Sequence, residues 1–112
     1  MIETDEREQQ AIETVYEELA GLNCIPIKLR RGEGLDDAAM NRVREAIHFL
    51  NERWSERPYV PKRLAAAFVD IQASMEWGRD QYSEEEQVKI EDAGIELVTL
   101  ANALFDVEQD SE

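Results

Sequence analysis

Hydrophobic residues recur along most of this chain at the three- and four-residue spacing that places them on one face of an α-helix. Four segments show the pattern and predict four helices. Thr4 is a suitable cap for the first helix, and Gly21 provides a stop at its end. The predicted helices span residues 4–20, 36 or 37 to 56, 61–82 and 83–107.

Each predicted helix has one apolar stripe that is expected to face the core. Pro61 suits the first position of the third helix, and Ser83 with Glu86 matches the capping box at the start of the fourth. The four stripes are Ile12, Val15, Tyr16 and Leu19; Met40, Val43, Ile47, Leu50 and Trp54; Leu64, Phe68, Ile71, Met75 and Tyr82; and Ile90, Ala93, Leu97, Ala101 and Leu104.

The stretch 22–35 breaks the helical pattern. Residues 24–29 alternate between apolar and other side chains, include β-branched residues and contain Pro26. This composition predicts an extended segment across the end of the helices, or a lone strand. Residues 31–34 are typical of a turn because they include two glycines.

The predicted links between helices are short, which favours antiparallel neighbours. We therefore predict an all-α fold, an antiparallel up-down four-helix bundle with a short extended segment between its first two helices. Residues 1–112 form one domain in this interpretation, and the acidic tail 108–112 is expected to fray.

The charge of the chain narrows the classes of partner. Lys and Arg total 12 against 26 Asp and Glu, which gives a formal net charge of -14. Such a surface repels nucleic acid and anionic membranes, and it attracts a basic protein surface. The same composition also serves solubility or adaptation to salt, so two interpretations of the charge stay open.

The location predicted from the sequence is the cytoplasm. No apolar run reaches the roughly 20 residues that cross a bilayer, and the first residues are acidic, unlike a secretory signal. Cys24 is the single cysteine, so it has no internal disulfide partner, which favours a reducing compartment.

Several apolar residues fall outside the predicted core stripes. Either the third helix is central and buried on two sides, or these residues form a contact surface for a second copy or a partner. The candidate interface residues are Ala66, Val69, Ala73 and Trp77 on the third helix, Phe49 on the second, and Val88 and Ile95 on the fourth.

No residue pattern predicts a catalytic site, a cofactor or a metal centre. Glu45 and His48 form one Glu-x-x-His pair, but di-iron bundles need a second copy, and both residues fall off the core stripe. We interpret His48 as a surface histidine. One cysteine and one histidine also cannot supply the four ligands of a structural zinc site.

One short segment suggests an enzymatic alternative. The run Glu17-Glu18-Leu19-Ala20-Gly21-Leu22 resembles the Glu-Glu-Leu-Gly-Glu-Leu opening of helical nucleotide pyrophosphatases of the MazG kind. The resemblance implies magnesium held by helix carboxylates. The family needs further Glu-x-x-Glu and Glu-x-x-Asp pairs, and the nearby pair Glu33–Asp36 is interrupted by Gly34.

We therefore favour a non-enzymatic, acidic interaction module, such as an inhibitor or immunity-like protein that binds a basic protein surface. The alternatives are a magnesium-dependent nucleotide pyrophosphatase and a homodimeric structural protein. Two acidic patches are the candidate contacts for a basic partner: Glu84, Glu85, Glu86, Glu91 and Asp92, and Glu13, Glu17 and Glu18.

Overall fold

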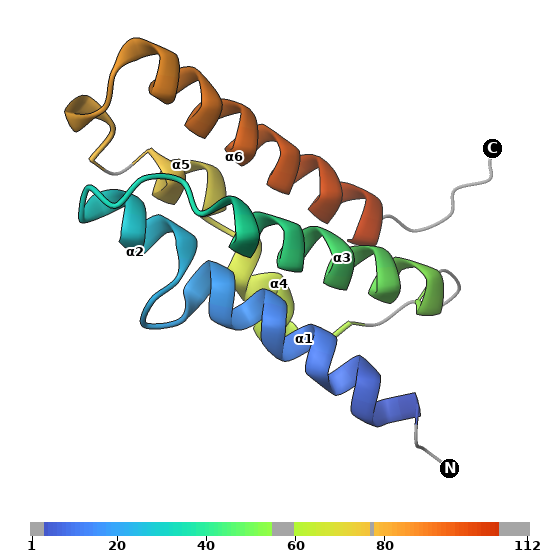
Figure 1. Ribbon diagram of the computed structural model, residues 1–112. Helices are drawn as coiled ribbons and strands as arrows, with labels where there is room; N and C mark the ends of the chain where they lie inside the picture. Colours follow the sequence, from blue (N-terminus) through green and yellow to red (C-terminus); the bar gives the residue numbers. More distant parts are fainter. Residues whose placement is uncertain (1–3, 55–59, 77, 106–112) are drawn as a thin grey trace, which may run out of the picture.

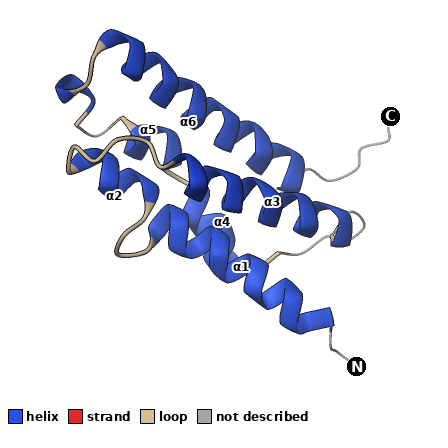
Figure 2. Cartoon of the chain, in the orientation of Figure 1, coloured by secondary structure: helices blue, strands red, loops and turns tan. Residues whose placement is uncertain are grey.

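The structure, a computed structural model, describes residues 4–54, 60–76 and 78–105, and every regular element within these ranges is a helix (Figures 1 and 2). The all-α prediction is confirmed. The elements are α1 (Thr4–Ala20), α2 (Ile25–Arg30), α3 (Asp37–Arg53), α4 (Lys62–Phe68), α5 (Ile71–Met75), the 3₁₀ turn η1 (Arg79–Gln81) and α6 (Glu84–Phe105).

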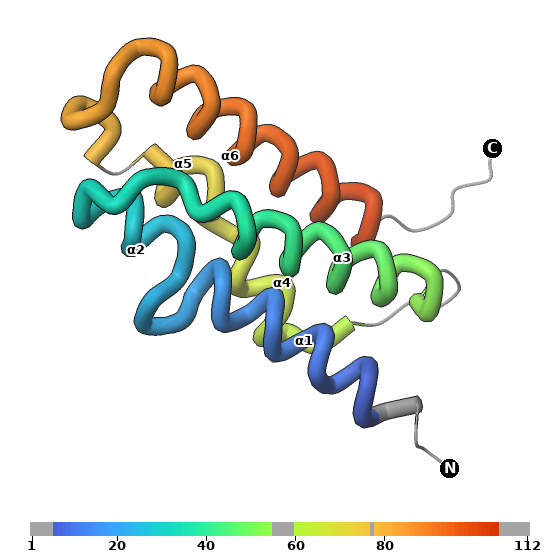
Figure 3. Tube along the Cα trace, in the orientation of Figure 1, coloured from blue at the N-terminus to red at the C-terminus, as the bar shows by residue number. Residues whose placement is uncertain are grey.

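Helix α3 packs against both α1 and α6, and α4 also contacts these two helices from behind α3 in the view of Figure 1. Helix α5 packs against α6 and α2. In Figure 3, α1 runs in one direction along the molecule, while α3 and α6 run in the opposite direction. The shortest dimension is 20 Å, which is about the thickness of two helices.

The predicted stripes meet in one hydrophobic core. Every stripe residue is buried except Tyr16 and Tyr82, which are half-buried at the edge of the core. Helix α2 adds the fully buried side chains of Ile25 and Leu29 to it. Periodicity therefore identified most of the core correctly, because each long helix buries the face that carries its apolar residues.

The prediction of an extended segment between the first two helices is wrong. Residues 25–30 form α2, and Pro26 occupies its first turn, where a missing N–H costs no hydrogen bond. Ile25 and Leu29 are four residues apart and share the buried face. With no strand beside it in the described part of the chain, a helix is the conformation that satisfies the backbone of this segment internally.

The prediction of one continuous helix over residues 61–82 is also wrong. It is divided into α4 and α5, with Val69 and Asp70 at the break, and neither residue type favours a helix. Beyond α5, Gly78 has a left-handed backbone with φ of 70°, a conformation that glycine adopts without strain. Tyr82 therefore lies outside the helix to which the sequence pattern assigned it.

The other helix bounds differ little from the predictions. Helix α1 spans the expected residues, and α3 ends at Arg53. Helix α6 begins at Glu84, where the Ser83 Oγ accepts a hydrogen bond from the Glu86 N–H at 3.2 Å, as the capping pattern predicted. The expected end of this helix at Val107 and the tail 108–112 lie outside the described residues.

Candidate functional site

Helix α6 has a buried face and an exposed face that differ in chemistry. The buried face contacts α3, α4 and α5. On the opposite side, Val88 and Ile95 are 55% and 48% exposed, seven residues or about two turns apart. The residues of the buried face are Ile90, Ala93, Gly94, Leu97, Ala101 and Leu104.

Carboxylates lie in line with these two exposed apolar side chains and along one side of them. The spacing of α6 places Glu84 and Glu91 in line with Val88 and Ile95, and it places Glu85 and Asp92 about a quarter of a turn around the helix, both on the same side. All four acidic residues are exposed, and none of their carboxylates forms an ion pair with a described residue. We call this surface the outer face of α6, and it comprises Glu84, Glu85, Val88, Glu91, Asp92 and Ile95.

Glu86 does not belong to this face, although the sequence grouped it with the same patch. It borders a hollow of about 210 Å³ together with Asp37 and Lys89, on the side of α6 that turns toward the start of α3. Thr99 continues the outer face toward the end of the helix, where its hydroxyl donates to the Ile95 carbonyl at 2.9 Å. Beyond Ile95, the same side of α6 is therefore polar but uncharged at Thr99.

Contacts with two other segments hold α6 in place. Arg44 of α3 makes two hydrogen bonds to the Glu96 carboxylate, at 2.6 and 2.9 Å, and a further one to Asn41. The hydrogen bonds from Arg44 lower the pKa of Glu96. This paired arrangement fixes the orientation of the α6 flank next to Asp92 and Ile95.

The start of α6 is attached to the end of α2 through Tyr82. The Tyr82 hydroxyl donates to the Leu29 carbonyl at 2.7 Å and accepts from the Gly34 N–H at 3.1 Å. Gln81 also donates to the carbonyls of Leu29 and Arg30. The sequence pattern missed this role, because it placed Tyr82 on a core stripe.

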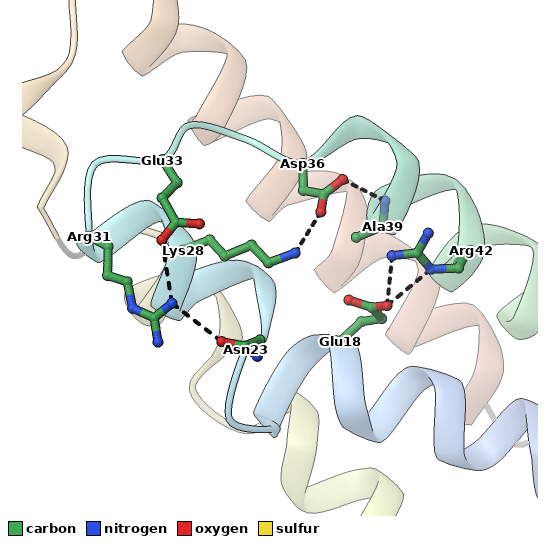
Figure 4. Close-up of polar contacts among 8 residues, drawn as sticks. All are labelled: Glu18, Asn23, Lys28, Arg31, Glu33, Asp36, Ala39 and Arg42. Carbon is green, nitrogen blue, oxygen red and sulfur yellow. Dashed lines mark hydrogen bonds and ion pairs between the residues drawn. The ribbon is translucent and has the colours of Figure 1, made fainter.

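The second acidic patch is divided in the structure. Glu18 forms an ion pair with Arg42 of α3 at 2.9 Å, and this pair links α1 to α3 (Figure 4). Glu13 and Glu17 are exposed on α1, one turn apart. Glu17 and Glu18 both border an open hollow of about 640 Å³ at the α1–α2 turn, where Lys28 also lies.

A second group of charges fixes the connection from α2 to α3. The Asp36 carboxylate accepts from the Ala39 N–H at 3.0 Å and from Lys28 Nζ at 2.7 Å, so it caps α3 and holds α2 beside it (Figure 4). The Lys28 hydrogen bond, followed by that of Ala39, lowers the pKa of Asp36. The same hydrogen bond raises the pKa of Lys28.

Phe49 is half-buried rather than freely exposed. The guanidinium groups of Arg7 and Arg53 lie over its ring, 5.5 and 4.9 Å from the centroid. These cation–π contacts cover the ring from within the chain. Phe49 also borders a shallow groove of about 350 Å³ between α1 and α3.

The three described third-helix candidates are exposed but do not share one continuous helix. Ala66 lies on α4 and Ala73 on α5, and Val69, at the break between them, is 75% exposed. Trp77, the aromatic member of this group, lies outside the described residues. The break separates the small residues that the sequence pattern had aligned into one stripe.

One exposed apolar residue was not identified from the sequence. Leu22 is 89% exposed in the turn between α1 and α2, beside the 640 Å³ hollow. Leu22 follows Gly21, just after the end of α1. A residue in such a connecting turn is expected to lie at the surface, so its position in the sequence could have indicated the exposure.

His48 and Cys24, the histidine and cysteine considered for a zinc site, lie in different segments of the chain and differ in exposure. His48 is exposed on α3, whereas Cys24 is buried at the start of α2. Among the described residues, no group of three or more His, Cys, Asp or Glu side chains is arranged to hold a metal ion.

Within the described ranges, no helix is both long and apolar enough to pass through a membrane. Comparison of the chain with protein-family models, with curated proteins and with solved structures found no match.

Proposed function

We propose that this chain is a non-enzymatic interaction module that binds a basic protein surface, as an inhibitor or immunity-like protein would. The observation that carries the proposal is the outer face of α6, where Val88 and Ile95 are exposed among carboxylates that have no ion-pair partner in the described chain. Exposed apolar side chains give such a surface contact area, and the surrounding charge gives it selectivity and fast encounter.

We also propose that the scaffold of this module is a four-helix bundle and that the protein is located in the cytoplasm. The four members of an up-down bundle would be α1, α3, the α4–α5 pair and α6. The opposite directions of the packed helices α1 and α3 in Figure 3 support antiparallel packing of that pair, whereas the neighbours α3 and α6 run in the same direction. The cytoplasm is the proposed location, which the single cysteine supports. The bundle would hold α6 at one edge, with its outer face free to bind.

The test is capture of partners from the source lysate at low and high salt, with identification by mass spectrometry. Glu84→Gln/Glu91→Gln removes two charges from the outer face, and Glu13→Gln/Glu17→Gln removes two from α1 as a matched control. We expect one stoichiometric basic protein that is lost in high salt and lost with the α6 variant. The control variant should retain it.

Two outcomes would overturn the proposal. Equal capture by both variants would place binding away from α6. Recovery of only untagged copies of the chain itself would instead favour a homodimer, with the exposed residues Ala66, Val69 and Ala73 as the first surface to vary.

A further inference from the structure

The outer face of α6 also restricts the kind of partner that fits it. This inference rests on the proposed function and makes it more specific. Val88 and Ile95 are about two turns apart on a straight helix, and the acidic residues lie in rows beside and between them. An occupant must therefore supply apolar contacts at that spacing, with positive charge between them and along the one side where Glu85 and Asp92 lie.

A second copy of this chain does not meet that requirement. If two α6 helices paired in antiparallel orientation about the Val88–Ile95 stripe, residues 91 and 92 would lie at the centre and face the same residues of the other copy. In parallel orientation, each acidic residue would face its own equivalent. Either symmetric arrangement brings Glu91 and Asp92 close to like charges, which opposes association.

An extended peptide is also a poor fit, because α6 uses its backbone N–H and C=O groups within the helix and offers none for strand pairing. A helix can instead pack a ridge of its side chains against Val88 and Ile95. Lys or Arg residues on its flanks would then reach Glu84, Glu85, Glu91 and Asp92.

We propose that the outer face of α6 binds a basic amphipathic α-helix of a protein partner. The partner helix lies along α6 and carries apolar residues at helical spacing against Val88 and Ile95. Its Lys and Arg residues lie along that stripe and on the side of Glu85 and Asp92, where they pair with the four carboxylates. They face residues 84–92, because Thr99, beyond Ile95 on the same side of α6, carries no charge.

The probe is a synthetic helical peptide of about 18 residues, or five turns, with one leucine stripe flanked by lysine and arginine. Its control is a permuted peptide of identical composition in which the leucines no longer share a face. Both are titrated calorimetrically into the full chain at low and at high salt. The net charge is then the same for the two peptides, and only the amphipathic one presents a continuous apolar stripe.

The wild-type chain should bind the amphipathic peptide about tenfold or more tightly than the permuted peptide. Val88→Ser/Ile95→Ser should remove this difference. Glu84→Gln/Glu91→Gln should weaken both peptides, whereas the matched control Glu13→Gln/Glu17→Gln should change neither. The substituted side chains are exposed, so circular dichroism should show that every variant stays folded.

Equal, salt-sensitive binding of the two peptides would overturn the helix inference but leave an acidic surface that binds basic proteins. Binding of neither peptide would contradict the proposed function itself. Equal weakening by the α1 control variant would move the contact to α1 and overturn the assignment to α6.

Discussion

Tyr82 shows how a single side chain can connect two segments that are distant in the sequence. Its hydroxyl bonds to Leu29 and Gly34 at once, so Tyr82→Phe removes two hydrogen bonds without opening a cavity. We expect the free energy of unfolding to fall by about 1–2 kcal/mol in urea titrations. Tyr16→Phe is the matched control, because no described residue bonds to its hydroxyl, and equal losses would contradict the structural role of Tyr82.

Asp36 provides a test that depends on pH. Asp36→Asn keeps an N-cap acceptor for α3 but removes the charge paired with Lys28. Because the folded pKa of Asp36 is lowered, the charge contributes stability above the ordinary aspartate pKa of about 4. That contribution is lost as pH falls through the lower folded value.

Wild type should therefore be more stable than Asp36→Asn at neutral pH, and the difference should shrink as the solution is acidified. Urea midpoints measured across the acid range give this comparison directly. A difference that does not vary with pH would mean that the Lys28 pair contributes nothing.

At the scale of helices, the contact between α5 and α6 contains a glycine that can be replaced. A Cβ added at Gly94 would lie 3.6 Å from the Met75 Cβ, an ordinary packing distance. Gly94→Ala should stabilise the chain by about 0.5–1 kcal/mol, because alanine favours the helix interior. The measurement is the urea midpoint, and a loss of stability would show that α5 and α6 pack more tightly than described.

Gly78 is the contrasting case. Its φ is 70°, and an added Cβ would lie 3.2 Å from the Arg30 Cα and 2.5 Å from Gln81 Nε2. Gly78→Ala should therefore destabilise the chain by about 1 kcal/mol or more. The opposite signs at two glycines separate helix propensity from backbone conformation.

The same elements show what the sequence could and could not predict. The spacing of apolar residues was sufficient for α1, α3 and α6, because each is long and buries one face. Residues 25–30 are too few for periodicity to distinguish a helix from a strand. Pro26 favours the first turn of a helix and Gly78 favours the end of one, and these two signals indicate boundaries that apolar spacing alone does not.

At the scale of the whole molecule, charge opposes the compact state. The formal net charge is -14, so mutual repulsion among carboxylates lowers stability when salt is low. Added salt should raise the urea midpoint, and Glu84→Gln/Glu91→Gln should be less sensitive to salt than wild type. A midpoint that falls with salt would indicate that attractive pairs such as Arg44–Glu96 dominate.

The outer face of α6 was predictable in composition but not in outline. The sequence identified Val88, Ile95 and the acidic residues separately, and the helical structure places them on one surface. The structure also places Glu86 on another side of α6 and pairs Glu18 with Arg42. The pairing of Glu18 depends on how α1 packs against α3, which the spacing of residues does not show. The residue types of this surface could therefore be predicted from the sequence, whereas the ion pairs between helices could not.

The proposed function requires a basic protein to bind the outer face of α6. The most direct measurement is the amide NMR spectrum of the isotope-labelled chain, titrated with the basic protein captured from lysate. We expect the largest shifts on the residues of the α6 outer face, from Glu84 to Ile95, and we expect these shifts to vanish in high salt. Shifts concentrated on α1, or on α4 and α5, would contradict the proposal.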